Sequence, residues 1–202
     1  NRNIEAFTFL SNIVKDKSVD PGSAGFTGDD ALKAYGSGQA AIVVNQPGLE
    51  KRFPDQAQNI VLFAPLAAPH GDKGTMSWVN NIMLYKQTKS PDASRTFLTW
   101  WSANQKPLWT EGHNSQIPTR TSIANDPYFQ TNPYTKQTLE QWVPIGKSSG
   151  AKIAGIIPAL NDFEGSGDLN TLTTDILQGM DPRAALQKCE TGLKNHLKKY
   201  NV

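Results

Sequence analysis

The sequence predicts an α/β fold, in which helices alternate with a few short, buried strands. Apolar residues recur at helical spacing near the start of the chain, as at Ile4, Phe7 and Leu10. Short apolar runs rich in β-branched residues follow, at residues 40–45 and 59–66, and prolines interrupt both runs or follow them. Such runs are typical of strands that are covered on both faces. Chains that combine the two patterns usually form layered α/β proteins.

The first helix begins almost at once, because its apolar face extends from Ile4 to Val14. Natural chains rarely start inside an amphipathic helix, so we expect a fragment or a processed piece of a longer protein. Thr27 and Asp30 have the spacing of a capping box and predict a short helix that runs to Tyr35.

Residues 77–85 (SWVNNIMLY) alternate in the manner of a third strand. A helix is predicted directly after them, since Ser90 can cap it, Pro91 suits its first position and Asp92 lies at the positive end of its dipole. Its tryptophans, Trp100 and Trp101, are expected to be buried.

The last third of the chain is predicted to be mainly helical. Residues 144–168 have little periodicity and are expected to form loops, and Asp168 is a candidate cap for the next helix. Asp181 and Pro182 begin the final helix, which carries Cys189 on its apolar stripe.

The composition narrows the classes of function. The 202 residues include 20 Lys and Arg against 18 Asp and Glu, a net charge of +2. This balance does not suit a surface that coats nucleic acid or a membrane. No apolar run reaches the roughly 18 residues of a membrane-spanning helix. The single cysteine, Cys189, excludes an internal disulfide framework and a multi-cysteine zinc site.

Several catalytic patterns are present only in part. Residues 146–150 match G-x-S-x-G around Ser148, but neither a buried strand before them nor a helix after them is predicted, so a solvent loop is favoured. A phosphate-binding loop would need a glycine five positions before Gly146, where the chain has glutamine. The three histidines lack ligand spacing, so neither a metal nor a cofactor is predicted. A Cys189–His113 nucleophile pair stays open, although a thiol on an apolar stripe is usually inert.

Aromatic rings beside amides and carboxylates favour a sugar ligand. The C–H face of a sugar stacks on an aromatic ring, and planar amides and carboxylates bind its hydroxyl groups in pairs. These groups are Trp78 with Asn80 and Asn81, and Asn161 and Asp162 with Phe163 and Glu164. The alternative is that some of these rings belong to the core.

Taken in order, these segments resemble the second half of a bacterial extracellular solute-binding protein, of the sugar-binding family that includes maltose-binding protein. The resemblance covers essentially the whole chain. The turn at residues 45–48 (NQPG) lacks the aromatic residue that the family usually has there. The matching segments are residues 34–42 (AYGSGQAAI), 45–48, 74–85, 90–101, 112–120 and 176–186 (ILQGMDPRAAL).

The resemblance implies a class II periplasmic-binding-protein-like fold, with two α/β lobes, crossing strands and a hinge about which the lobes close on a ligand. Residues 1–75 and 124–202 would form the C-terminal lobe. Residues 76–123 would form a crossover strand and helices of the hinge or of the N-terminal lobe, which is missing here. The ligand-binding residues that it implies are Asn45, Gln46, Trp78, His113, Arg120, Asn161, Asp162 and Phe163, the last three on a loop at residues 158–168.

The function implied is that of the substrate-binding component of an ABC importer, which delivers a sugar or oligosaccharide to a membrane permease. Such a protein is not an enzyme, and it is periplasmic or extracellular, either free or attached to the cell surface as a lipoprotein. A charged solute is the alternative: a glycerol phosphodiester would favour Arg120, Lys51 and Arg52, and a polyamine Asp162 and Glu164. A small serine or cysteine hydrolase is the third option.

Overall fold

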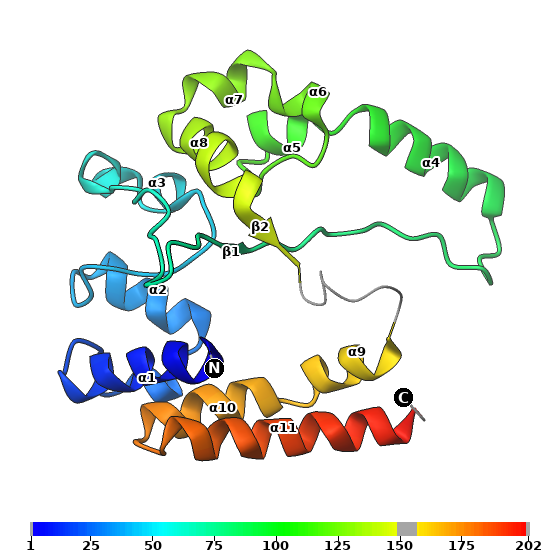
Figure 1. The fold of residues 1–202 in the computed structure, drawn as a ribbon. Helices are drawn as coiled ribbons and strands as arrows, with labels where there is room; N and C mark the ends of the chain where they lie inside the picture. The colour runs from blue at the N-terminus through cyan, green and yellow to red at the C-terminus, as the bar shows by residue number, and fades with distance from the viewer. Residues whose placement is uncertain (1, 149–156, 201–202) are drawn as a thin grey trace. The chain divides into compact units, whose positions relative to one another are not determined.

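The computed structural model describes residues 2–148 and 157–200, and its chain divides into two compact units (Figure 1). Unit 1 comprises Asn1–Val43 and Lys152–Val202, and unit 2 comprises Val44–Ala151.

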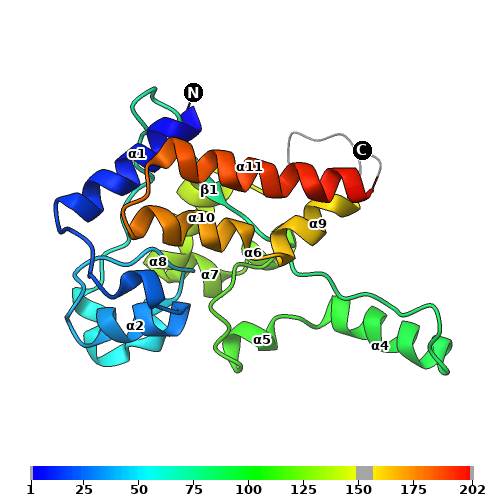
Figure 2. The ribbon, with the colours of Figure 1, turned by 90° about the horizontal axis from the view of Figure 1, so that it is seen from below.

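Unit 1 is built from helices that come from both ends of the chain. Helix α1 packs against α10 and α11, and α9 packs against α11. Figures 1 and 2 show α10 and α11 lying along each other. The helices of this unit are α1 (Arg2–Lys15), the 3-10 turn η1 (Ser23–Gly25), α2 (Gly28–Gly36), α9 (Pro158–Gly165), α10 (Asp168–Leu177) and α11 (Pro182–Lys199).

The core of unit 1 follows the predicted apolar stripes. Ile176 is fully buried between Leu172 and Ala185, and four partly buried side chains pack against this cluster: Phe7, Leu10, Leu186 and Cys189. Two of the predicted helix starts are confirmed as well, whereas Ser90, at the N-cap of α4 (Pro91–Ala103), makes no side-chain capping hydrogen bond. Thr27 and Asp30 form a reciprocal capping box on α2, and the Asp181 side chain accepts hydrogen bonds from the first backbone N–H groups of α11.

Unit 2 consists of short helices and long extended segments. Its core contains Phe129, which is 2% exposed, with the Trp109 ring packed edge-on against it at 5.4 Å. The helices are α3 (Leu49–Arg52), η2 (Pro54–Asn59), α4 (Pro91–Ala103), α5 (Pro107–Thr110), α6 (Thr121–Ala124), α7 (Pro127–Thr131), α8 (Pro133–Gln137), the π-helical turn η3 (Thr138–Trp142) and η4 (Val143–Ile145).

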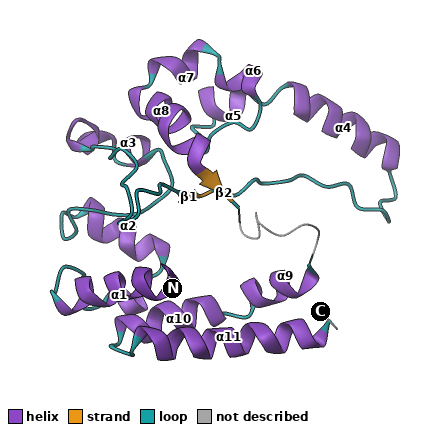
Figure 3. Ribbon diagram, in the orientation of Figure 1, coloured by secondary structure: helices purple, strands orange, loops and turns teal. Residues whose placement is uncertain are grey.

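The described residues contain one small sheet, shown in orange in Figure 3. Strands β1 (Thr75–Met76) and β2 (Gly146–Lys147) pair in parallel, with Thr75 opposite Gly146. The predicted strands at 40–45, 59–66 and 77–85 are wrong as strands, because none of these residues belongs to a strand ladder. In 77–85 only the backbone N–H of Ser77 continues the pairing of β1, to the carbonyl of Lys147 at 2.9 Å. The structure is therefore mostly helical, and the predicted α/β class holds only in this reduced form.

In the second predicted strand, residues 59–66, side chains from other segments bind backbone carbonyl groups. The hydroxyl of Tyr134 lies 2.8 Å from the carbonyl oxygen of Ile60. Further along, the amide of Gln137 donates to the carbonyl of Leu62 at 3.1 Å, and the indole N–H of Trp142 donates to that of Phe63 at 3.1 Å. These bonds satisfy backbone acceptors that a neighbouring strand would otherwise bind.

Two apolar segments of unit 2 are exposed instead of buried. In residues 77–85, Trp78 is 69% exposed, and Met83 and Tyr85 are also exposed. On α4, Trp100 is 57% exposed, so the prediction that its ring is buried is wrong. On the same apolar face of α4, Phe97 is also exposed and Trp101 is half-buried.

Residues 158–165 form helix α9, so the predicted loop is wrong there. Pro158 occupies the first turn, and Ala159 and Phe163, four residues apart, form its buried face. The cap of α10 is Gly167, with a φ of 85°, and Asp168 is the first helical residue rather than the cap.

None of the helices in the described residues is both long enough and apolar enough to cross a membrane.

Candidate ligand-binding pocket

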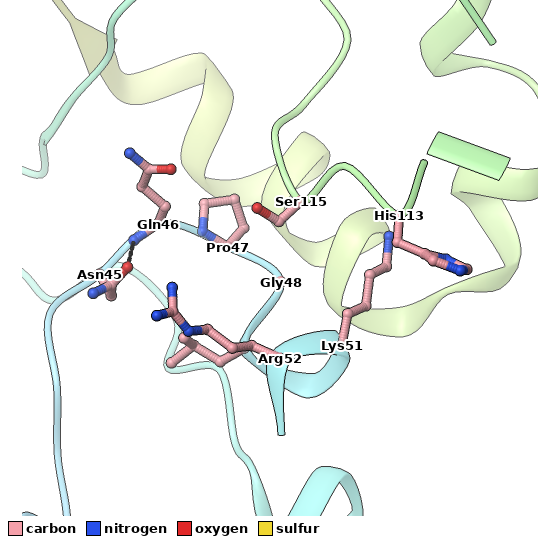
Figure 4. Close-up of a pocket in the computed structure, with 9 residues that line it drawn as sticks. Asn45, Gln46, Pro47, Gly48, Lys51, Arg52, His113 and Ser115 are labelled. Atoms are coloured by element: carbon pink, nitrogen blue, oxygen red, sulfur yellow. Dashed lines mark hydrogen bonds between the residues drawn. The ribbon is translucent and has the colours of Figure 1, made fainter. Parts of the chain in front are cut away.

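Three segments of unit 2 enclose a hollow of about 200 Å³ (Figure 4). They are the turn at residues 45–48, helix α3 and the loop at residues 113–115. The lining residues are Asn45, Gln46, Pro47, Gly48, Leu49, Lys51, Arg52, His113 and Ser115. The pocket thus brings together three of the predicted site residues, Asn45, Gln46 and His113.

The turn is fixed by local hydrogen bonding and by a glycine. The side-chain oxygen of Asn45 accepts a hydrogen bond from the backbone N–H of Gln46 at 2.7 Å. Gly48 adopts a φ of 95°, a left-handed conformation that only glycine takes without strain. A side chain at this position would collide with Ser115, so the missing Cβ lets the turn and the loop approach closely.

The loop is anchored to the core of unit 2. The Trp109 ring is buried, and its indole N–H donates to the carbonyl of Gln116 at 2.6 Å. The backbone N–H of Asn114 donates to the carbonyl of Leu108, and its side chain accepts from the N–H of Gln116. Figure 4 shows the His113 side chain directed away from the turn, so its ring lies at the edge of the pocket.

The charge of the lining is positive. Lys51 and Arg52 both contribute to it, and none of its lining residues is acidic. The Lys51 ammonium lies 5.6 Å from the centre of the Tyr128 ring, which holds it by a cation–π contact. The neighbouring acid, Glu50, accepts a hydrogen bond from the Asn132 amide at 3.4 Å.

Trp78 lies outside the lining, but its segment is tied to the same loop. The Asn80 amide donates to the side-chain oxygen of Gln116 at 3.3 Å, and Gln116 follows directly after the lining residue Ser115. The exposed Trp78 ring is thus in a segment that is hydrogen-bonded to the loop.

Arg120 occupies a different hollow. Its guanidinium donates a hydrogen bond to the hydroxyl of Ser102 on α4. Together with Leu98, Thr99 and Ala103, these residues surround a shallow depression that does not include the turn or helix α3. Arg120 is therefore not a lining residue of the pocket.

Asn161, Asp162 and Phe163 lie on α9 in unit 1. Phe163 is 7% exposed and packs against the His196 ring, so the prediction that it offers a free face to a ligand is not met in this structure. Asp162 accepts hydrogen bonds from the Lys199 ammonium at 2.7 Å and the Tyr200 hydroxyl at 2.8 Å. These bonds hold the pKa of Asp162 below its ordinary value.

The catalytic alternatives gain no support. Burial raises the pKa of the Cys189 thiol, with a smaller effect from the Asp168 charge, so the thiol is held away from the reactive thiolate form. Strand β2 before Ser148 is only two residues long, and the second half of the G-x-S-x-G pattern lies outside the described residues. The described part of the chain contains no group of three or more metal-ligating side chains.

The sequence indicates two structural features of the pocket only weakly. The Pro47-Gly48 pair marks a turn, but the close approach to Ser115 depends on a contact between segments more than 60 residues apart. In the sequence, Lys51 and Arg52 point only to a charged ligand, because sequence alone does not show that α3 faces the turn and the loop.

Comparison with known proteins places this architecture in a family. Residues 4–137 match the model of the bacterial extracellular solute-binding proteins, and the chain belongs to this family of binding proteins, which is not a family of enzymes. A comparison with curated protein sequences finds no significant match.

The fold is periplasmic-binding-protein-like. It is similar to a sugar transporter from Arthrobacter chlorophenolicus A6, whose crystal structure contains bound laminaribiose. The two chains are 32% identical, with a TM-score of 0.88 over 96% of this chain. The match covers 50% of the other chain, so the present chain spans about half of its length.

Proposed function

We propose that this protein binds a sugar or oligosaccharide in an interlobe cleft and delivers it to the membrane permease of an ABC importer. The observation that carries the proposal is the similarity, over 96% of the chain, to a sugar transporter that has laminaribiose bound. Membership of the extracellular solute-binding family supports a periplasmic or extracellular location.

The pocket in unit 2 supplies the chemistry that such a ligand needs. Asn45 and Gln46 offer amide groups that both donate and accept hydrogen bonds, as sugar hydroxyl groups require. The hydroxyl of Ser115 adds a third group of this type on the facing loop. His113 lies at the edge, where it would meet the part of the ligand that extends out of the pocket.

Trp78 is proposed as a stacking platform. Its ring is 69% exposed, so it is available to a sugar face without any rearrangement of the core. We also propose that residues 76–123 lie at the hinge or against an N-terminal lobe. The exposed apolar side chains of residues 77–85 and of α4 support this, because large apolar patches on soluble proteins usually mark interfaces.

Calorimetric titration of the protein at its full natural length tests the proposal. Laminaribiose, other disaccharides, glycerol phosphodiesters and polyamines are titrated in turn, and we expect saturable binding of at least one carbohydrate. Binding confined to polyamines or to phosphodiesters would overturn it, and so would turnover of an ester or a peptide.

A charged solute is the second candidate, and only its anionic form has an observation in its favour. Lys51 and Arg52 line the pocket, as a phosphodiester would require. A polyamine is disfavoured, since the Asp162 carboxylate is already bound by Lys199 and Tyr200.

A further inference from the structure

We infer that the sugar bound in this pocket carries an anionic group, a carboxylate or a phosphate, which Lys51 and Arg52 recognise. This inference rests on the proposed carbohydrate function and names the class of carbohydrate. It is drawn from the distribution of donors and acceptors around the hollow.

Two of the lining side chains, those of Lys51 and Arg52, are cationic. An ammonium and a guanidinium only donate, whereas each hydroxyl group of a sugar both donates and accepts. Ionised carboxylates and phosphates mainly accept hydrogen bonds, and they form short, charge-assisted bonds with ammonium and guanidinium groups. The two amides of the turn remain to bind the neutral hydroxyl groups of the same ligand.

The surroundings of Lys51 preserve its charge for a ligand. The residue is half-buried, and its ammonium is held over the Tyr128 ring, an uncharged partner that leaves the positive charge in place. Figure 4 shows its side chain extending from α3 toward the loop that carries His113 and Ser115. In a partly enclosed hollow of this kind, water screens an opposite charge less than it does on an open surface.

No acidic side chain of the described residues lines the pocket, and the acids near it in sequence, among them Glu50, Asp55 and Asp126, lie outside the lining. Glu50, between Leu49 and Lys51, is bound by the Asn132 amide. Asp126, close to Tyr128 in sequence, accepts a hydrogen bond from the Lys106 ammonium at 2.7 Å. Within the lining, Lys51 therefore contributes positive charge that no acidic lining residue offsets.

The test compares ligands that differ only in charge. At low salt, the protein at its full natural length is titrated with laminaribiose, a disaccharide that ends in glucuronic acid, and a disaccharide phosphate, with inorganic phosphate and free glucuronate as separate arms. We expect an acidic disaccharide to bind at least about tenfold more tightly than the neutral one, a ratio typical of one charge-assisted bond. The ratio should fall as sodium chloride is added.

Three variants test whether Lys51 and Arg52 cause the preference for the acidic disaccharide. Lys51→Met should lower the affinity for the acidic disaccharide about tenfold more than that for the neutral one, and Arg52→Met should act in the same direction. Lys86→Met removes the same charge from an exposed residue outside the pocket lining and should leave the ratio unchanged. Melting curves recorded without ligand show that each variant is folded.

The outcomes separate the two proposals. Equal or tighter binding of the neutral disaccharide overturns the anionic inference and leaves carbohydrate binding intact. An acidic preference that survives both Lys51→Met and Arg52→Met overturns it too. Binding of inorganic phosphate or free glucuronate as tightly as the whole disaccharide, with no binding of any neutral sugar, overturns the carbohydrate function itself.

Discussion

Replacing Gly48 by alanine tests how the turn and the loop of the pocket meet. The φ of 95° at this residue places a Cβ in the left-handed region, which costs about 1–2 kcal/mol. The new Cβ would also collide with the Cβ of Ser115 and lie 3.1 Å from its Cα, so backbone as well as side chain must move. Overpacking of this kind costs about 1–3 kcal/mol, which gives a total of roughly 2–5 kcal/mol.

Gly71→Ala is the matched control, since Gly71 has a φ of 80° but nothing within 4 Å of the position of a Cβ. Urea denaturation at 25 °C measures both variants, and Gly48→Ala should lose about 1–3 kcal/mol more than Gly71→Ala. Adding Ser115→Gly to Gly48→Ala should restore part of that difference, because the serine Cβ is removed. Equal losses in the two single variants, or no recovery in the double variant, would refute the close approach of turn and loop.

Three further predictions concern the core, the pH response and the stacking ring. Ile176→Ala should lower the free energy of unfolding by about 2–5 kcal/mol in urea titrations, whereas Leu169→Ala, at a 43% exposed residue of the same helix, should lower it much less. Lys199 lowers the pKa of Asp162, so this carboxylate stabilises the fold above its ordinary pKa of 3.8 and loses that effect as the pH falls through the lower folded-state value. Asp162→Asn should therefore lower the melting temperature at neutral pH and differ progressively less from the wild type at acidic pH, and a constant difference would contradict this. Trp78→Ala should weaken carbohydrate binding measured by calorimetry while the melting temperature stays nearly constant, and a large loss of stability would mean that the ring is part of the core.

The helices that sequence predicted well are those whose information is local. The capping box of Thr27 and Asp30 needs only four residues, and all of them lie within one turn of α2. The apolar stripe of α11 likewise follows from spacing, and its Cys189 packs on the core as the pattern requires. Such features depend only on residues that are close together in the chain, so they can be predicted from the sequence directly.

The strand predictions were wrong because a segment becomes a strand only when a neighbouring segment pairs with its backbone. Residues 59–66 have the composition of a buried strand, but their carbonyl groups are bound by the side chains of Tyr134, Gln137 and Trp142 from far along the chain. Composition indicates that a segment is extended and apolar, whereas the pairing depends on what lies beside it. The same reasoning explains α4, whose amphipathic pattern is correct although its apolar face is exposed.

The candidate site was predictable in part for a similar reason. The turn residues Asn45 and Gln46 follow from the resemblance, which carries their position relative to residues 34–42. Phe163 was misjudged because a helix with buried faces at Ala159 and Phe163 has only one apolar pair to reveal it, among glycines and polar residues that indicate a loop. The place of Lys51 in the pocket lining needed the folded structure, since the lining includes a loop more than 60 residues away.

The proposed N-terminal lobe would account both for the small size of the pocket and for the exposed apolar segments of unit 2. Binding sites for small molecules usually enclose about 300–1,000 Å³ and bury most of the ligand, whereas this hollow measures about 200 Å³. Residues 77–85 and α4 present large apolar side chains to solvent, which is costly unless another polypeptide surface covers them. A second lobe that packs on these segments would also provide the opposite wall of the pocket. Closure of such a lobe would desolvate Lys51 and the bound anionic group together, and the charge-dependent part of the affinity would then grow with the degree of closure.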